Sequence, residues 1–318
     1  MSELLVGVDL GGTQIRAVLA EADGTILARY NTLTAPEDGP GAVLERVVAA
    51  ARAVLTMARQ PVRGVGIGSA GALDPWTGSV QSAPNLGWHD IPLKATLESR
   101  LGVPVVVGND ANAAALAEKR FGAGQGVEDL LYVTVSTGIG SGIISGGRLV
   151  LGAHGSAGEI GHIPILPDGA RCQCGQRGCL EALAAGPALA RDAAERIAAG
   201  MPSSILVLVQ GDPAQITAEV VARAAAHGDR LARDVIRQAA FYLGIGLVTL
   251  IHTLEPQLIL IGGGVAQIGD LLLSTIRGTV RERVIPCMAP SLRIEPAALG
   301  KDAGVLGAIA LFLEYGNS

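Results

Sequence analysis

Three cysteines and one histidine lie close together in the sequence, in a pattern that suits a metal ion. Cys172, Cys174 and Cys179 form a C-x-C-x₄-C motif, and His162 lies shortly before them. Three thiolates and one imidazole make the tetrahedral Cys₃His set that is typical of structural zinc. Because this set leaves no open coordination position, the motif predicts zinc with a structural role. The alternative is a group of reduced surface thiols beside an unrelated histidine.

A carboxylate follows directly after an apolar segment rich in valine, at Asn109-Asp110. A carboxylate at the carboxyl end of a strand in an α/β fold is well placed to meet a ligand. In phosphoryl transfer to a hydroxyl group, such a carboxylate accepts the hydroxyl proton while the oxygen attacks phosphorus. Either residue also suits the N-cap of a helix over 111–120. The two roles are compatible if Asn109 caps the helix and Asp110 reacts.

Two turns rich in glycine and threonine follow apolar segments, one near residue 11 and one near residue 138. The first is Asp9-Leu10-Gly11-Gly12-Thr13, and the second, 136–142, contains Thr137 and Gly138. Glycine lets several backbone N–H groups converge on a phosphate, and an aspartate can hold Mg²⁺. Each turn alone also fits an ordinary hairpin, but the pair predicts a polyphosphate site.

A third glycine run, Gly262-Gly263-Gly264, follows a buried apolar segment. It suits either the nucleoside end of ATP or a plain turn from a strand to a helix.

The zinc motif also has polar neighbours. Glu159 and Glu181, with Asn85, Asn109 and Asp110, supply the donors and acceptors that a polyhydroxylated ligand needs. Either glutamate alone also fits a solvated surface carboxylate.

Apolar patterning predicts strands and helices in an α/β arrangement. Strands are expected at 4–9, 14–22, 25–33, 65–69 and 103–108, with a helix at 41–59. The order strand, glycine turn, strand, tight turn, strand occurs at 4–33 and again at 130–151. This repeat predicts two similar lobes with a cleft. Helices are expected over most of 217–254 and at 270–284 and 303–315, and strands at 256–261 and 292–296.

Composition limits the class of protein. Of 318 residues, 49% are hydrophobic and 17% charged, which permits a large core. The net charge of −5 and the absence of a long Lys/Arg run argue against a nucleic-acid partner. The N-terminus lacks the features of a signal peptide, so a cytoplasmic location is expected. The longest apolar stretch, 239–251, predicts a buried helix and not a membrane span, which needs about 20 residues. Cys287, apart from the motif, is expected in the core.

These motifs together resemble the ROK family of sugar kinases and repressors. The resemblance rests on Asp9 to Thr13, on Glu159-Ile160-Gly161-His162, and on the cysteine motif with its flanking Leu180-Glu181. It covers essentially the whole chain in the expected order. The cysteine motif is highly specific, whereas the glycine motifs are individually weak. One departure is Gln14, where many members of the family carry lysine.

The resemblance implies a two-lobed actin/hexokinase-like fold with ribonuclease H-like lobes and ATP and sugar in the cleft. The lobes are expected at 1–112 with 300–318, and at 113–299 with the zinc site. It implies a hexokinase that uses MgATP on the 6-hydroxyl of a hexose, glucose being the expected sugar, and a homodimer or higher homo-oligomer. Asp110 matches the catalytic base, and His162, Cys172, Cys174 and Cys179 match the zinc ligands. The implied sugar contacts are Asn85, Asn109, Asp110, Glu159, His162 and Glu181. The implied nucleotide contacts are Asp9, Gly11, Gly12, Thr13, Thr137, Gly138, Gly262, Gly263 and Gly264.

Several alternatives remain at this stage. Kinases of N-acetylhexosamines and other hexoses share the motifs. A sugar-responsive repressor of the family carries an added N-terminal helix-turn-helix domain, for which the position of the first glycine turn leaves no room. In a sugar-binding module without catalysis, Asp110 would have no role beside the predicted sugar contacts. Polyphosphate in place of ATP is expected to need a basic groove, and the sequence shows none.

Overall fold

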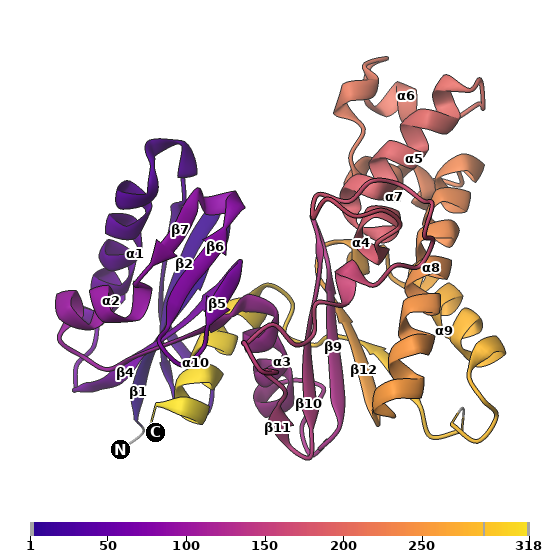
Figure 1. Cartoon of the computed structure of the whole chain (residues 1–318). Coiled ribbons are helices and arrows are strands. Elements are labelled where there is room, and N and C mark those ends of the chain that lie inside the picture. Colours follow the sequence, from indigo (N-terminus) through magenta and orange to yellow (C-terminus); the bar gives the residue numbers. More distant parts are fainter. Residues whose placement is uncertain (1–2, 289, 317–318) are drawn as a thin grey trace. The chain divides into compact units, whose positions relative to one another are not determined.

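The computed structural model describes residues 3–288 and 290–316 (Figure 1). The chain divides into two compact units. Unit 1 comprises Met1–Tyr132, Gly142–Gly158 and Ala297–Ser318, and unit 2 comprises Val133–Ser141 and Glu159–Pro296. The lobe limits expected from the sequence stay a prediction.

The first sheet has the strand order β3-β2-β1-β4-β8. Strands β1, β2 and β3 are antiparallel neighbours, whereas β1, β4 and β8 run parallel. The bounds are β1 Leu4–Leu10, β2 Gln14–Glu21, β3 Ile26–Leu33, β4 Val62–Ser69 and β8 Val105–Asn109. The helices of unit 1 are α1 Pro40–Leu55, α2 Leu93–Leu101, α3 Asp110–Phe121 and α10 Ala303–Tyr315.

The second sheet repeats this order as β11-β10-β9-β12-β13, which confirms the predicted duplication. Its strands are β9 Leu130–Val135, β10 Ile139–Ser145, β11 Arg148–Leu149, β12 Leu258–Gly262 and β13 Arg293–Pro296. The helices of unit 2 are α4 Leu180–Ala184, α5 Gly186–Ala198, α6 Ile205–Leu208, α7 Ala218–Ala226, α8 Arg230–Leu254 and α9 Asp270–Arg283. Most of the expected strands and helices are therefore present within a few residues of their predicted ends.

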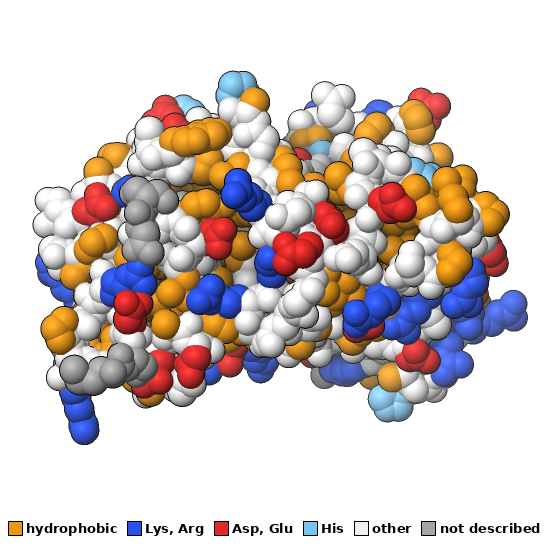
Figure 2. Space-filling model, turned by 90° about the horizontal axis from the view of Figure 1, so that it is seen from below, with side chains coloured by type: hydrophobic (Ala, Val, Ile, Leu, Met, Phe, Trp, Pro, Cys, Tyr) orange, Lys and Arg blue, Asp and Glu red, His pale blue; other side chains and the backbone are white. Residues whose placement is uncertain are grey.

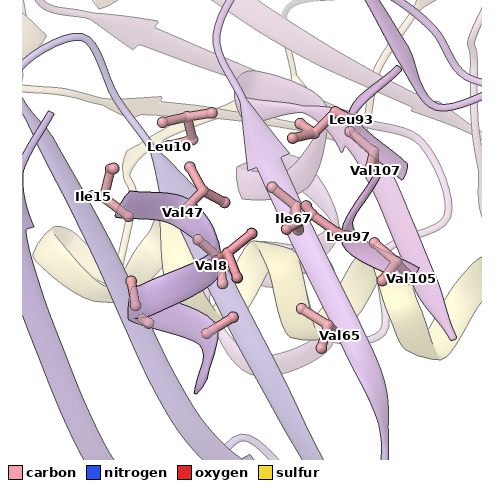
Figure 3. Close-up of a cluster of buried hydrophobic side chains, with 14 of the residues drawn as sticks. Val8, Leu10, Ile15, Val47, Val65, Ile67, Leu93, Leu97, Val105 and Val107 are labelled. Carbon is pink, nitrogen blue, oxygen red and sulfur yellow. The ribbon is translucent and has the colours of Figure 1, made fainter. Parts of the chain in front are cut away.

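Branched aliphatic side chains form the core on one face of the first sheet (Figure 3). Val8, Ile67 and Val107 come from the three parallel strands, and Val47 and Leu97 cover them from α1 and α2. Burying each such side chain contributes about 1.5–3 kcal/mol to folding. This core holds the parallel strands in fixed register, so that their carboxyl ends have defined positions.

Helix α10 packs on the opposite face of the same sheet, as expected of the last helix. Val305, Ile309 and Phe312 form a buried cluster with Leu5 and Val18. The backbone of α10 comes so close to the sheet that glycine is required there. A Cβ atom at Gly66 would lie on the carbonyl oxygen of Ala308, and one at Gly7 on that of Val305.

Gly66→Ala should therefore destabilise the chain strongly. Neither carbonyl oxygen nor strand can move without separating α10 from the sheet, so we expect a loss of about 3 kcal/mol or more in the free energy of unfolding. Gly41→Ala is the matched control. Gly41 lies in α1 with no atom near its missing Cβ, and alanine there should stabilise the helix by about 0.5–1 kcal/mol. Urea unfolding of both variants measures the difference; equal stabilities would contradict this packing.

Helix α8 is long and apolar enough to pass the length and composition test for a membrane span. It is instead a core helix, because 56% of its apolar window is buried and it packs against α4, α5, α7 and α9. This confirms the predicted buried helix.

Two features differ from the sequence-based expectations. A small sheet of β5 Ala72–Asp74, β6 Ser79–Ala83 and β7 Trp88–Ile91 was not predicted, because its strands are short and carry no regular alternation of apolar residues. Cys287 is exposed, so its predicted place in the core was wrong. It lies in a turn after α9, in the exposed stretch 285–287.

Candidate active site and metal centre

The parallel strands of unit 1 bring two carboxylates to one edge of the first sheet. Asp9 pairs with Gly68 between β1 and β4, and Gly68 pairs with Gly108 between β4 and β8. Asp110 follows two residues after Gly108. Because the carboxyl ends of parallel strands meet at one edge of a sheet, Asp9 and Asp110 both lie where an α/β fold binds its ligands.

Asn109 is the N-cap of α3. Its side-chain oxygen accepts hydrogen bonds from the backbone N–H groups of Ala111 at 2.9 Å and Asn112 at 3.1 Å. The half-buried Asp110 also accepts from Ala111 through Oδ1, at 2.8 Å. The cap is therefore supplied by Asn109, as the sequence allowed. The carboxylate of Asp110 stands in the first turn of α3, at the N-terminal end of the helix.

Asp9 is buried, with Arg16 as its ionic partner. The two residues face each other across β1 and β2, and Arg16 Nη2 lies 3.4 Å from Asp9 Oδ2. Burial raises the pKa of the Asp9 carboxyl above its ordinary value, and the Arg16 guanidinium offsets this only in part. A Cβ atom at Gly304, in the first turn of α10, would collide with the Asp9 carboxylate. A bound cation would therefore stabilise the charged form of the Asp9 carboxylate, which burial disfavours.

Asp9→Asn should make the ligand-free chain more stable at neutral pH. The folded-state pKa of Asp9 is raised, so its contribution to stability falls as pH rises from the unfolded value through the folded one. Removing the charge removes that cost, and the gain over wild type should be larger at pH 7 than near pH 4. Thermal unfolding without magnesium or ATP measures it.

Asp302→Asn is the control of opposite sign. Arg29 holds the pKa of the Asp302 carboxyl below its ordinary value through hydrogen bonds of 2.6 and 2.9 Å. Its stabilising effect is present at neutral pH and lost as pH falls through the folded pKa. Asp302→Asn should therefore lower stability slightly at pH 7. A decrease for Asp9→Asn as well would contradict the account of Asp9.

The first glycine turn lies beside Asn85. A Cβ atom at Gly12 would be 3.3 Å from Cβ of Asn85, and both residues belong to unit 1. Thr34 fixes this turn, because its hydroxyl donates to Gly11 O at 2.7 Å and its N–H to Thr13 O at 2.9 Å. Thr13 and Asn85 are exposed. Unit 1 thus gathers the predicted phosphate turn and one predicted sugar contact in one place.

In unit 2 the other two glycine turns lie against each other. Gly263 is so close to Val135 that a Cβ atom would touch its backbone, and a Cβ at Gly264 would be 3.8 Å from Ser136 Oγ. The Ser136 N–H donates to Gly138 O at 2.8 Å, which closes the turn around the exposed Thr137. Gly263 has a φ of +87°, a left-handed conformation that favours glycine. The geometry therefore joins the predicted phosphate and nucleoside contacts of this unit.

Glu181 connects the second glycine turn to the cysteine motif. Its Oε2 accepts from the Ile139 N–H at 3.0 Å, and its Oε1 lies 3.7 Å from Cys172 Sγ. A Cβ atom at Gly138 would be 2.6 Å from Oε2. The half-buried carboxylate is thus held by the turn, and is not the freely solvated group that one glutamate alone would be.

The four predicted metal ligands form one cluster. The ligand atoms of His162, Cys172, Cys174 and Cys179 all lie within 4.8 Å of one another. Cys174 Sγ is 3.7 Å from Cys179 Sγ, and Cys172 Sγ is 3.7 Å from His162 Nδ1. A tetrahedron with Zn–S bonds of about 2.3 Å has edges of about 3.8 Å. The residues therefore fit a structural zinc ion.

The thiols also need a cation to be charged together. Burial raises the pKa of Cys179 to about 12 and raises that of Cys172, whereas the Gln176 N–H lowers that of Cys174. Zinc binds thiolates, so binding must release the protons of the buried thiols. Zinc affinity should consequently fall as pH falls.

His162 presents its two ring nitrogens to different partners. Nδ1 faces the cysteine motif, and Nε2 lies 3.9 Å from Glu159 Oε2. Both side chains are exposed. With Nδ1 on a metal, Nε2 would carry the hydrogen and point toward Glu159 and solvent. One nitrogen can thus bind the metal while the other donates to a ligand.

The predicted site residues are divided between the two units. Unit 1 contains Asp9, Gly11, Gly12, Thr13, Asn85, Asn109 and Asp110. Unit 2 contains Thr137, Gly138, Glu159, His162, Cys172, Cys174, Cys179, Glu181, Gly262, Gly263 and Gly264. The sequence-based reasoning missed Arg16 and Gly304 beside Asp9. The sequence did not reveal Arg16, because a two-residue turn at Gly11-Gly12 would place residue 14 opposite residue 9, whereas the observed register pairs Asp9 with Arg16.

Comparison with known proteins decides the family. A model of the ROK family matches residues 5–315. The chain belongs to the ROK family. The glucokinase of Halalkalibacterium halodurans is 38% identical to this ROK protein over 317 residues, which covers 98% of this chain and 96% of the relative.

Solved structures of ROK proteins confirm the predicted hexokinase-like α/β fold. The ROK glucokinase of Streptomyces griseus, solved with glucose and AMPPNP, matches with a TM-score of 0.86 and 40% identity, over 97% of this chain and 98% of that one. The xylose repressor of Caldicellulosiruptor bescii is also similar, at 32% identity over 97% of this chain and 78% of its own length. The family thus includes both glucokinases and repressors similar to this ROK protein.

Proposed function

We propose that this ROK protein is an ATP-dependent hexokinase, with glucose as its expected substrate. The observation that carries the proposal is the meeting of Asp9, the first glycine turn and Asp110 at one edge of the first sheet. Phosphoryl transfer needs a phosphate cradle, a carboxylate for the magnesium of MgATP and a base for the hydroxyl. Similarity to glucokinases at 38–40% identity supports the same reading.

In this proposal Asp110 accepts the proton of the 6-hydroxyl while the hydroxyl oxygen attacks the γ-phosphorus of ATP. The bond between that phosphorus and the β–γ bridging oxygen breaks, and ADP leaves. Asn109 keeps the base in place by capping α3, so Asp110 need not do so. Asn85, Asn109, Glu159, His162 and Glu181 hold the remaining hydroxyls. Bound magnesium supplies charge neutralisation at the phosphates, and Asp9 is the residue that would hold it, directly or through water.

Nucleotide contacts come from Gly11, Gly12 and Thr13, from Thr137 and Gly138, and from the turn at Gly262 to Gly264. His162 and the three cysteines would hold a zinc ion with a structural role. With Nδ1 of His162 on that ion, Nε2 would be the ring nitrogen that donates to a sugar hydroxyl. We further infer a cytoplasmic enzyme that assembles as a homodimer or larger homo-oligomer.

ATP is the expected donor in preference to polyphosphate. Figure 2 shows basic side chains interspersed with acidic and apolar ones over most of the displayed face. A pocket of unit 2 is lined by Arg277, Arg281 and Arg293, but Arg277 donates to Ile294 O at 2.8 Å and Arg293 pairs with Glu295 at 2.9 Å. Two of the three arginines thus already have partners within the protein, so this pocket is poorly suited to bind a polyphosphate chain.

A phosphorylation assay over a panel of sugars tests the proposal. Glucose, N-acetylglucosamine, N-acetylmannosamine, allose and fructose are each supplied with MgATP or with polyphosphate. We expect glucose with ATP to give the highest kcat/KM. Turnover of another sugar would change the substrate and keep the reaction, whereas binding of sugar without any turnover would favour the regulatory role of the repressors.

A further inference from the structure

Unit 1 contains a cavity that the proposed reaction does not use. It has a volume of about 280 Å³ and is lined by the 73–78 turn, β8, the first turn of α3, the segment 149–155 and the end of α10. Asp9, the first glycine turn, Asn85 and Asp110 are not among its lining residues. Asn109 is the one residue that it shares with the proposed sugar contacts.

The cavity runs along the free edge of β8, the last strand of the first sheet. Val106 belongs to the cluster under α10 and Val107 to the core on the other face, yet both line the cavity. It therefore reaches both faces of the sheet at its edge. An edge strand presents one row of backbone N–H and C=O groups to whatever lies beside it.

Two polar groups of the lining lack partners among the described residues. Asn112 is 4% exposed, and its Oδ1 accepts no hydrogen bond. A buried acceptor without a donor is costly, by about 1–3 kcal/mol. Lys94, in the first turn of α2, forms no ion pair, so its ammonium has no fixed counter-charge in the described structure.

The rest of the lining is largely apolar and includes an aromatic side chain at the surface. Trp76 is 61% exposed, an unusual degree for so large an apolar group. An apolar cavity of about 150 Å³ can hold benzene, so one of 280 Å³ suits a bicyclic ring system. A ligand that complements this lining has a flat apolar body, a hydrogen-bond donor for Asn112 Oδ1 and a negative charge for the Lys94 ammonium.

We propose that this cavity binds a small aromatic acid that carries an N–H or O–H donor. The donor reaches Asn112 Oδ1, the acid group pairs with Lys94, and the ring lies against Trp76 and the edge of β8. The site is separate from the proposed kinase chemistry, and binding needs no turnover.

Occupancy of the cavity should still affect turnover if the kinase proposal holds. Asn112 donates its backbone N–H to the Asn109 cap, and Asp110 lies between these residues in the sequence. A ligand that contacts both asparagines would bias the turn that carries the base. The expected result is a change in kcat with ATP affinity unchanged.

Fluorine NMR with 5-fluorotryptophan provides a direct binding test with an internal control. The chain has two tryptophans: Trp76 lines the cavity, whereas Trp88 is 2% exposed and does not line it. Indole-3-acetate, added up to about 5 mM, should shift the Trp76 signal in a saturable way and leave that of Trp88 unchanged. Trp76→Phe assigns the two signals.

Matched probes and variants identify the contacts. 1-Methylindole-3-acetate lacks the N–H donor and should bind wild type about tenfold more weakly than indole-3-acetate. Asn112→Leu should remove this difference, and it should fold at least as stably, because it replaces an unpaired acceptor. Lys94→Met should remove the preference for indole-3-acetate over indole-3-acetamide, whereas Lys301→Met, outside the cavity, should retain it.

Filling the cavity with Leu151→Trp should abolish saturable binding; the added tryptophan gives a third signal, so Trp76 is followed by its assigned shift. The proposal is overturned if indole-3-acetate shifts neither tryptophan, shifts both together, or binds wild type no better than its N-methyl analogue. Unaltered binding to Leu151→Trp would also overturn it. Loss of kinase activity with binding intact would count against the kinase proposal alone.

Discussion

Asp110→Asn should lower kcat by about 10²–10⁴-fold, the usual contribution of a general base. The affinity for the hexose should change little, because asparagine keeps the size and polarity of the side chain. Folding should also be preserved. Asn109 supplies the cap of α3, and an amide oxygen at position 110 can still accept from the Ala111 N–H. Steady-state kinetics and sugar calorimetry on the same preparation measure both quantities.

Asp90→Asn is the matched control for loss of one carboxylate. Asp90 is exposed and has a φ of +49°, a conformation that asparagine adopts readily. Its kcat should equal that of wild type. If Asp110→Asn also kept the wild-type kcat, Asp110 would not be the base.

Cys174→Ser should remove the zinc ion and raise the KM for the hexose by about 10–100-fold, the usual effect of losing the partners that orient a functional group. Without the metal, no bond fixes Nδ1 of His162, so the ring loses the orientation that aims Nε2. The affinity for ATP should change much less, because Thr137 and Gly138 are held by Glu181 and by their own turn. Elemental analysis and kinetics measure the two effects.

Cys287→Ser provides the control for this change. Cys287 is exposed and lies outside the cluster of four ligands, so zinc content and KM should match those of wild type. Full zinc content in Cys174→Ser would show that Cys174 is not a ligand. Loss of zinc with an unchanged KM would show that the ion stabilises the fold and does not orient His162 toward the sugar.

The sequence predicted what depends on local pattern. The helix at 303–315 matches α10 in both ends, because its apolar run is uninterrupted and has no competing strand pattern. The duplicated order of strands was visible because glycine turns recur between apolar runs. The small sheet from β5 to β7 was not, since its strands are short and carry no regular alternation of apolar residues.

For the site, the four zinc ligands were predictable because thiols and imidazole have few other reasons to cluster. The pKa values and contacts that follow from burial of the site residues were not predictable. The raised pKa of Asp9 and the two connections of Glu181 depend on which groups the fold brings to them, and nothing in the sequence marks Arg16, Ile139 or Cys172 as those partners. The unpaired Asn112 Oδ1 likewise appears only in three dimensions.

The most direct test of the central claim is a crystal structure of the protein with glucose and a non-hydrolysable ATP analogue. The account predicts that a carboxylate oxygen of Asp110 lies within hydrogen-bond reach of the 6-hydroxyl, about 2.6–3.2 Å. A bound hexose with every hydroxyl out of reach of Asp110 would contradict it.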